Sequence, residues 1–386
     1  MKHRPAARPR PSGRVQFAAV FRKEVRQTAR DRRMMFMLVA APLIQTVVFG
    51  FAVDFTVDRV PTVVVDRDGT DLSRLHARRL LADGTLRRVP SPPGGSEADT
   101  ALDLGRAAAA VVLPPRFAAD LTAGRSPEVQ VVIDGTDPNR STVAGATASR
   151  YFGEVAEALA RERMAALGRT PPAQLALAPR IFYNPTVQSP QYMIPGIAAM
   201  LLLVVTTIVT SIGLAREREM GTLEQVMVTP IRPTILLFGK IAPYVVIGFV
   251  DVALLLAAGT WVFGVPIRGS LWVLALGTLL YLLTTLGVGL LVSTISKTQQ
   301  QSFLAGFLFV MPAVLLSGVM SPIRAMPGWL QAITWVNPVR HYAEVMRSCL
   351  LRGAGFADLA VPLAALGLIG GSVFALAVAR FRTRLG

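Results

Sequence analysis

Six apolar segments constrain this chain more than any other feature of its sequence. A helix needs about 20 mostly apolar residues to cross the hydrocarbon core of a bilayer. The six segments that qualify are Met34–Val53, Met193–Ala215, Ile235–Val265, Leu271–Ile295, Phe303–Met320 and Leu359–Ala379. We therefore predict an α-helical integral membrane protein with six transmembrane helices. The composition agrees, because 52% of the 386 residues are hydrophobic and only 17% are charged.

The net charge of +16 is concentrated beside the apolar segments. Residues 1–33 carry eleven Lys and Arg against two acidic residues, whereas residues 54–192 carry sixteen charges of each sign. With the N-terminus inside, the cytoplasmic pieces hold 18 basic residues and the short outer pieces hold five, as the positive-inside rule requires. We therefore expect a bacterial inner-membrane protein with both termini in the cytoplasm. No nucleic-acid partner is expected, since the sequence has no basic patch interleaved with aromatic residues.

Residues 54–192 have the composition of a soluble domain, which we predict to be an inserted α/β domain outside the cytoplasm. Runs of β-branched residues predict strands over Pro61–Val65, Ala108–Leu113 and Glu128–Ile133. Helical spacing predicts helices over Asp71–Ala82 and Thr142–Ala166. The chain has a single cysteine, so an internal disulfide cannot hold this domain together.

The acidic residues of this domain lie mainly at turns. Asp66 and Asp68 precede Gly69, and Asp134 and Asp137 flank another glycine. Aspartate side chains bond the backbone in such turns, and the ligand spacing of a calcium loop is missing. We therefore expect no metal ion here.

The outer loop at residues 321–358 is predicted to contain a helix. Asn337 followed by Pro338 is a helix start, and Gly353 is a helix stop. The helix has an apolar face made of Val339, Tyr342, Met346, Cys349 and Leu350. We interpret it as an amphipathic element at the outer interface, which either anchors the protein or shapes an exit gate.

The sequence contains no catalytic signature. None of the four lysines stands in a phosphate-binding loop, and the three histidines form no metalloprotease motif. We expect a non-catalytic subunit without a cofactor, so any ATP hydrolysis would come from another chain. A membrane sensor with an outer ligand-binding domain and an ion-driven transporter are the alternatives.

The segment between the second and third apolar segments, residues 216–234, is the most informative. Its charges alternate in sign from Arg216 to Glu219, a Gly-Thr pair follows, and Leu223, Val226 and Met227 then have helical spacing. This pattern has two interpretations. The segment is either a short amphipathic helix on the cytoplasmic side that docks a partner protein, or a solvated charged loop.

This segment resembles the E-x-E-x-G-T-x-E-x-x-x-x-T-P signature of ABC (ATP-binding-cassette) type-2 transporter permeases. The matching residues are Glu217, Glu219, Gly221, Thr222, Glu224, Thr229 and Pro230. Further short matches run in order along nearly the whole chain, among them Lys23-Glu24, Tyr183-Asn184-Pro185, Gly239-Lys240 and Asn337-Pro338. They are similar to the subgroup with a large extracytoplasmic domain, which includes multidrug and linearmycin-type exporter permeases.

The resemblance implies two permeases, identical or sister chains, working in membrane lipid with two cytoplasmic ATPase subunits that bind ATP and Mg²⁺. Residues 1–33 would include an interfacial helix, residues 34–53 the first span, and residues 193–386 the other five spans. It also implies that Glu217, Glu219, Gly221, Thr222 and Glu224 couple the permease to the ATPase. Lys23, Glu24 and Asp31 would be contacts of the interfacial helix. The substrate would be an amphipathic drug, lipid or lipid-linked compound moved outward.

Asp251 lies in the middle of the third apolar segment, where an acidic residue is costly unless it is neutral, paired or hydrated. It is therefore a candidate for the translocation path, with a hydrogen-bonded packing contact as the alternative. No basic residue lies at a similar depth in an obvious partner position, which favours a protonated or hydrated acid over an ion pair.

Overall fold

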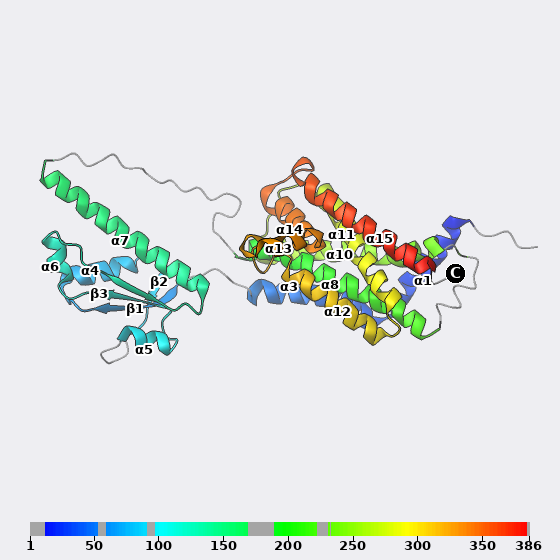
Figure 1. Ribbon diagram of the computed structural model, residues 1–386, viewed down its shortest axis with the longest axis horizontal. Coiled ribbons are helices and arrows are strands. Elements are labelled where there is room, and N and C mark those ends of the chain that lie inside the picture. The colour runs from blue at the N-terminus through cyan, green and yellow to red at the C-terminus, as the bar shows by residue number, and fades with distance from the viewer. Residues whose placement is uncertain are drawn as a thin grey trace, which may run out of the picture. The chain divides into compact units, whose positions relative to one another are not determined.

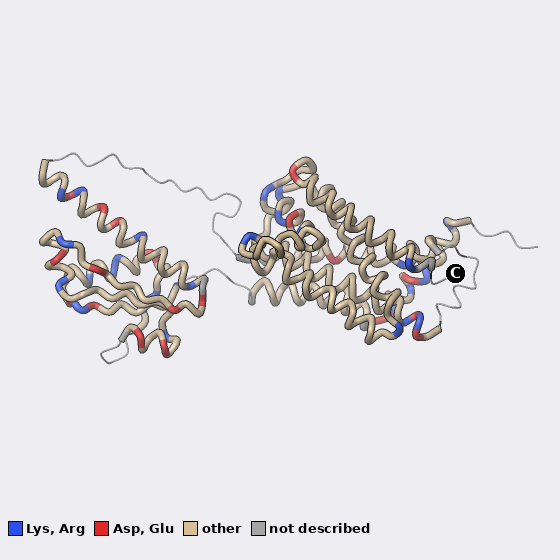
Figure 2. Tube along the Cα trace, in the orientation of Figure 1, with Lys and Arg blue, Asp and Glu red and all other residues tan. Residues whose placement is uncertain are grey.

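The computed structural model describes residues 12–52, 59–90, 97–168, 189–221, 231 and 233–383, and its chain is mostly helical (Figure 1). It divides into two compact units. One comprises Phe55–Arg180, and the other comprises Met1–Asp54 together with Ile181–Gly386. In the helical unit the charged residues gather toward the helix ends, whereas in the Phe55–Arg180 unit they are spread along its helices and strands (Figure 2).

The Met1–Asp54 and Ile181–Gly386 unit is a bundle of helices. Its α- and π-helical elements are α1 (Gly13–Arg30), α2 (Arg32–Met35), a π-helical turn (Phe36–Ala40), α3 (Ala41–Ala52), α8 (Ser189–Glu219), α10 (Pro233–Phe263), α11 (Leu271–Ile295), α12 (Gln299–Leu315), α13 (Gly328–Ile333), α14 (Pro338–Arg347), a second π-helical turn (Ser348–Arg352) and α15 (Ala360–Thr383).

Within the described residues, four helices are long and apolar enough to cross a membrane. They cover Pro190–Glu219, Thr234–Phe263, Leu271–Ile295 and Ala357–Arg380, and each coincides with a predicted span. The first and fifth predicted spans coincide with shorter apolar helices, Phe36–Phe51 and Gln299–Leu315. The count of six spans therefore stays a prediction.

The centre of the bundle is the packing of α11 against α8 and α14. Tyr281 of α11 is fully buried, stacks on Tyr342 with ring centroids 4.2 Å apart, and donates a hydrogen bond to the carbonyl of Ala199. Thr285 and Thr206 join the same two long helices by a hydroxyl hydrogen bond of 2.8 Å. Such polar contacts between helices add specificity where lipid is as apolar as the side chains.

The predicted start and stop of α14 are confirmed. The Asn337 side chain accepts a hydrogen bond from the Val339 N–H, and Gly353 ends the following π-helical turn at φ +73°. The predicted apolar face is buried, with Val339, Tyr342 and Met346 no more than 1% exposed. This face packs against α8, α11 and α15, so it is covered by protein rather than offered to lipid.

The Phe55–Arg180 unit is built on a four-stranded sheet in the order β2-β1-β3-β4. The strands are β1 (Val60–Asp66), β2 (Leu86–Arg88), β3 (Ala109–Leu113) and β4 (Gln130–Ile133). Both β2 and β3 pair parallel to β1, and β4 pairs antiparallel to β3. The helices are α4 (Asp71–Leu80), α5 (Glu97–Asp103), α6 (Phe117–Thr122) and α7 (Pro138–Ala166). The sequence analysis missed β2, because it has three residues, two of them arginines.

The aspartates of this unit cap turns, as predicted. Asp66 accepts hydrogen bonds from the backbone N–H groups of Asp68 and Gly69, and Asp134 accepts one from Thr136. Asp137 caps the start of α7. The side chains therefore stabilise the backbone where strands turn into helices.

Candidate functional site

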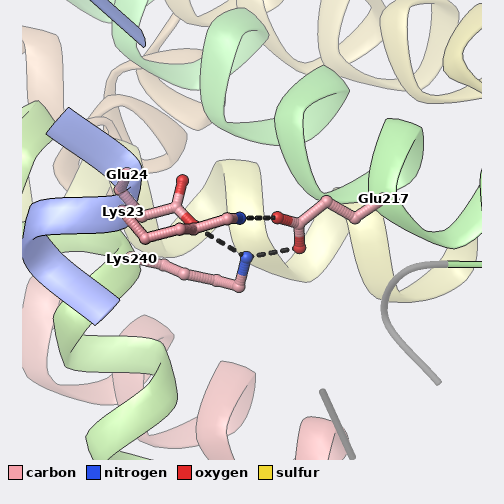
Figure 3. A network of polar contacts seen from close by, with 4 residues as sticks. All are labelled: Lys23, Glu24, Glu217 and Lys240. Carbon is pink, nitrogen blue, oxygen red and sulfur yellow. Dashed lines mark hydrogen bonds and ion pairs between the residues drawn. The ribbon is translucent and has the colours of Figure 1, made fainter. Parts of the chain in front are cut away.

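A cluster of four charged side chains lies where α1, α8 and α10 meet (Figure 3). We call Lys23, Glu24, Glu217 and Lys240 the charged cluster. Lys23 Nζ lies 2.8 Å from one oxygen of Glu24 and 2.8 Å from Glu217 Oε1. Lys240 Nζ lies 3.1 Å from Glu24 Oε1 and is hydrogen-bonded to Glu217 Oε2. The four formal charges sum to zero.

Three members of the charged cluster are buried. The side chains of Glu24 and Glu217 are 7% exposed and that of Lys240 is 9% exposed, whereas Lys23 is 48% exposed. Burial lowers the pKa of Lys23, but its bonds and charge interactions with Glu217 and Glu24 outweigh this, so the pKa is raised above its ordinary value. Each of the four charges therefore needs its partners in the cluster, because an unpaired charge away from water is costly.

Close packing of α1 on α10 explains how the charged cluster forms. The buried positions of α1 include Gln16, Val20, Glu24 and Thr28, which repeat every fourth residue along one face. Gly239 of α10 faces Val20 so closely that a Cβ atom would meet it at 2.8 Å. The absent side chain lets the two helices approach, which puts Lys240 within reach of Glu24.

Each residue of the last turn of α8 contacts a different part of the bundle. Arg216 pairs with Asp31 at 3.1 Å, and Glu217 belongs to the charged cluster. Arg218 donates a hydrogen bond of 2.7 Å to the carbonyl of Ser296, just after α11. Glu219 accepts one of 2.8 Å from the Gln299 side chain at the start of α12. Successive helical residues point about 100° apart, so one turn of alternating charges reaches four neighbours.

Asp31 lies at the break between α1 and α2, and its side chain bonds both α2 and α8. One carboxylate oxygen accepts a hydrogen bond from the Met34 N–H, which starts the next helical segment. The other oxygen accepts one from Arg216 of α8. The break after the N-terminal helix is thereby tied to the same turn of α8.

The boundary of the predicted loop 216–234 needs a correction at its start. We predicted that the loop begins at Arg216, but α8 continues to Glu219 because the charged side chains of this turn find partners on neighbouring helices. Gly221 then adopts φ +69°, a conformation that favours glycine. Thr222, Glu224 and the predicted amphipathic helix after them lie outside the described residues.

Asp251 is 2% exposed in α10. Neither of its carboxylate oxygens has a hydrogen-bond partner among the residues that the structure describes. This excludes both an ion pair and a hydrogen-bonded packing contact within that part of the chain. The structure therefore keeps Asp251 apart from the charged cluster.

Sequence comparison identifies the family of this chain. The model of the ABC-2 family of transporter proteins matches residues 32–379. The chain belongs to the ABC-2 transporter family. Its family membership makes it a multi-pass inner-membrane permease.

Several curated proteins resemble this ABC-2 chain over most of their length. It is 30% identical to the probable multidrug ABC transporter permease YbhR of Escherichia coli K12, covering 95% of this chain and 98% of the relative. It is 30% identical to the corresponding permease YbhS, covering 86% and 87%. The linearmycin resistance permease protein LnrN of Bacillus subtilis is 24% identical, covering 84% and 88%.

The partners that complete the site in this ABC-2 chain were not among the predicted site residues. Lys240 was noticed as part of a family match but not as a site residue, and Arg216, Arg218 and Gln299 were not singled out. A signal for Lys240 exists, since a lysine near the start of an apolar span is costly without a partner. The partners of Arg218 are backbone carbonyls, which no residue type reveals.

Proposed function

We propose that this chain is the permease subunit of an ABC exporter, and that a separate ATPase subunit binds ATP and Mg²⁺ and powers it. Two permeases, identical or sister chains, would form the membrane part. The substrate would be an amphipathic drug, lipid or lipid-linked compound moved outward. The relatives include a probable multidrug permease and a linearmycin resistance permease, and their names support this substrate class.

One observation carries the proposal. The last turn of α8, Arg216–Glu219, is bonded to α1, α10, the end of α11 and the start of α12. The loop that resembles the family's coupling element follows this turn directly. A force applied to that loop is therefore delivered to four places in the bundle rather than to one helix.

The proposed mechanism uses the rigidity of this turn. Closure of the ATPase subunits moves the loop, and α8 moves with it because its last turn is helical up to Glu219. The ion pairs of Glu217 pass the movement to α1 and α10, and Arg218 passes it to the end of α11. Packed helices shift as units, so the pathway opens to the other side of the membrane.

Orientation of the chain is part of the proposal. The loop after α8 meets the ATPase only if it is cytoplasmic, which requires the N-terminus to be cytoplasmic as well. The excess of Lys and Arg in residues 1–33 supports this orientation. The Phe55–Arg180 unit would then lie outside the cytoplasm.

Copurification after mild detergent extraction tests the proposal. We expect an ATPase subunit to copurify with the permease, and the double variant Glu219→Ala with Glu224→Ala to lose both this association and export. The matched control is Glu154→Ala with Glu162→Ala, which removes two carboxylates from exposed positions of α7. Unchanged ATPase association and export in the first double variant would show that the loop is not the coupling element.

An ion-driven transporter is the second candidate, and Asp251 is the observation that favours it. A buried carboxylate without a hydrogen-bond partner among the described residues suits proton uptake better than packing. Export by the variant Asp251→Asn distinguishes the ATP-driven exporter from the ion-driven transporter. Full export by this variant with undiminished dependence on ATP removes the ion-driven candidate, whereas loss of export that ATP does not restore favours it.

A further inference from the structure

An apolar groove lies within the Phe55–Arg180 unit, between α6, α7 and the residues that lead into β4. Its volume is about 370 Å³, which falls in the range of small-molecule pockets. Its apolar lining consists of Phe117, Val129, Val131, Phe152, Val155 and Leu159. Most of these side chains are half-buried, so the sheet and helices do not cover them completely.

The groove exists because α7 is longer than the sheet that it covers. The first half of α7 packs closely, with Ala144 and Ala148 each 1% exposed. Its 29 residues extend over about 43 Å, whereas the longest strand has seven residues. The C-terminal half of α7 therefore stands away from the sheet (Figure 1), and Val155 and Leu159 line the groove instead of a closed core.

A fixed positive charge lies beside these apolar side chains. Arg163 of α7 donates one hydrogen bond of 2.8 Å to the carbonyl of Leu121 and one of 3.2 Å to that of Gly124. Leu121 lies in the last turn of α6 and Gly124 follows that helix, so the guanidinium is held between α7 and the end of α6. A guanidinium has five N–H donors, which leaves others available for a ligand.

The charge of Arg163 differs from that of the second arginine in the lining. Arg125 is paired with Asp120, whose oxygen accepts from its Nε at 2.8 Å. No carboxylate in the described part of the chain forms an ion pair with Arg163. The groove thus combines an apolar wall with one uncompensated cation.

We propose that this groove binds an amphipathic anion, with its hydrocarbon chain along α7 and its carboxylate or phosphate headgroup on Arg163. A purely apolar ligand would leave the guanidinium without a counter-charge, and a small inorganic anion would leave the apolar wall exposed. The anion comes either from free solution or from a membrane lipid. The proposal does not depend on the direction of transport or on the ATPase.

The rival interpretation is that Arg163 serves only as a cap for the carbonyls at the end of α6. In that case removing its charge loosens α6 but has no effect on an added amphiphile. The two interpretations therefore differ in one measurable quantity, the affinity for an amphipathic anion.

Hydrogen–deuterium exchange of the full chain in phosphatidylcholine nanodiscs tests the proposal, with dodecyl phosphate as the probe. We expect the probe to slow exchange in α6 and in the C-terminal half of α7. Arg163→Gln should weaken this protection at least about tenfold in probe concentration, and Leu159→Asn should weaken it as well. Arg161→Gln is the matched control, because it removes the same charge two residues away on α7 and Arg161 does not line the groove.

Control experiments with other probes identify the ligand and show whether the proposal fails. Dodecanol and inorganic phosphate, which carry only one half of the proposed ligand, should protect weakly. Protection in nanodiscs of anionic phospholipid without probe identifies a lipid as the source, and protection with the probe alone identifies a free amphiphile. The proposal fails if the probe gives no protection, if dodecanol protects equally, or if Arg161→Gln and Arg163→Gln weaken protection equally. Protection that rises with protein concentration in the absence of any amphiphile also overturns it, since a second copy would then occupy the groove.

Discussion

The two units of this protein use ion pairs in opposite ways. In the helical unit, Lys23 pairs with Glu217 and Lys240 with Glu24, residues about 200 positions apart in the sequence, and three of the four side chains are buried. In the Phe55–Arg180 unit, pairs such as Arg125–Asp120 and Arg140–Asp137 are close in sequence, and the arginine of each is more than half exposed. Ion pairs therefore join distant helices in one unit and lie at the surface of the other.

Burial decides what such pairs contribute. Exposed pairs contribute about 0.2–1 kcal/mol, because water and salt screen the charges. Removing one partner of a buried pair costs about 3–5 kcal/mol, because it leaves a charge without compensation. A substitution in the charged cluster should therefore affect both stability and transport far more than one in the Phe55–Arg180 unit.

The largest effect should come from Lys240→Met. It leaves Glu24 and Glu217 with only the half-exposed Lys23, and we expect a loss of about 3–5 kcal/mol and of export. Thermal unfolding in nanodiscs and an export assay measure these effects. Lys297→Met is the matched control, because Lys297 is exposed. The charge-neutral double variant Lys240→Met with Glu217→Gln should recover part of the stability, and no recovery would contradict a charge-based role.

An intermediate effect is expected from Asp31→Asn. The amide oxygen still accepts from the Met34 N–H, but the ion pair with Arg216 is lost. Since both side chains are partly exposed, we expect a loss of about 1 kcal/mol in the free energy of unfolding. Thermal unfolding in nanodiscs measures this loss. The reversed pair, Asp31→Arg with Arg216→Asp, should be more stable than Asp31→Arg alone, because it restores the ion pair although not the acceptor for the Met34 N–H. If it is not, the contact acts through hydrogen-bond geometry rather than charge.

A smaller, pH-dependent effect is expected in the Phe55–Arg180 unit. Burial, and to a lesser degree the charge of Arg79, lowers the pKa of His76, whose Nδ1 lies 2.8 Å from the Tyr151 hydroxyl. The unfolded state then binds the proton more readily, so stability is full above pH ~6.5 and falls as the pH drops toward the lowered pKa. Hydrogen–deuterium exchange of α4 and α7 between pH 7.5 and pH 5 measures this fall. His76→Gln should flatten it, and an unchanged slope would assign the effect to another group.

The smallest effect should come from Arg150→Ala. Its pair with Asp83 joins α7 to the turn before β2 at 2.9 Å, but the arginine side chain is 64% exposed. We expect a loss of no more than about 1 kcal/mol and unchanged export. A loss of stability as large as that of Lys240→Met would show that the ion pairs of the two units do not differ in their contribution.

Sequence patterns predicted an element correctly where one short segment contains all the interactions that form it. The cap of α14 needs only Asn337 and Pro338, and it was predicted. The helix α7 begins at Pro138, four residues before the predicted start at Thr142, because Asp137 caps it. The strands β1, β3 and β4 were found from runs of β-branched residues. The strand β2 was not found, because it forms by pairing with β1 rather than from its own composition.

The charged cluster was only partly predictable. Family resemblance pointed to three of its members, Lys23, Glu24 and Glu217, but no local pattern joins residues on three different helices. The role of Lys240 depends on Gly239 allowing α1 to approach α10, which is a matter of packing. The same holds for Arg218, because its acceptors are carbonyls exposed by the end of α11.

Hydropathy and charge, which belong to single segments, were therefore enough to establish the membrane class and the four longest spans of this protein. They could not establish which charges neutralise one another, because a buried ion pair depends on the distance between side chains that folding brings together. Tertiary packing also left Asp251 buried without a partner among the described residues and left Arg163 beside an uncovered apolar groove. Asp251 already stood out in the sequence as an acidic residue within an apolar segment, and folding decided that it has no partner in the part of the chain that the structure describes. Arg163 is ordinary in the sequence, and only its surroundings make it a candidate for function.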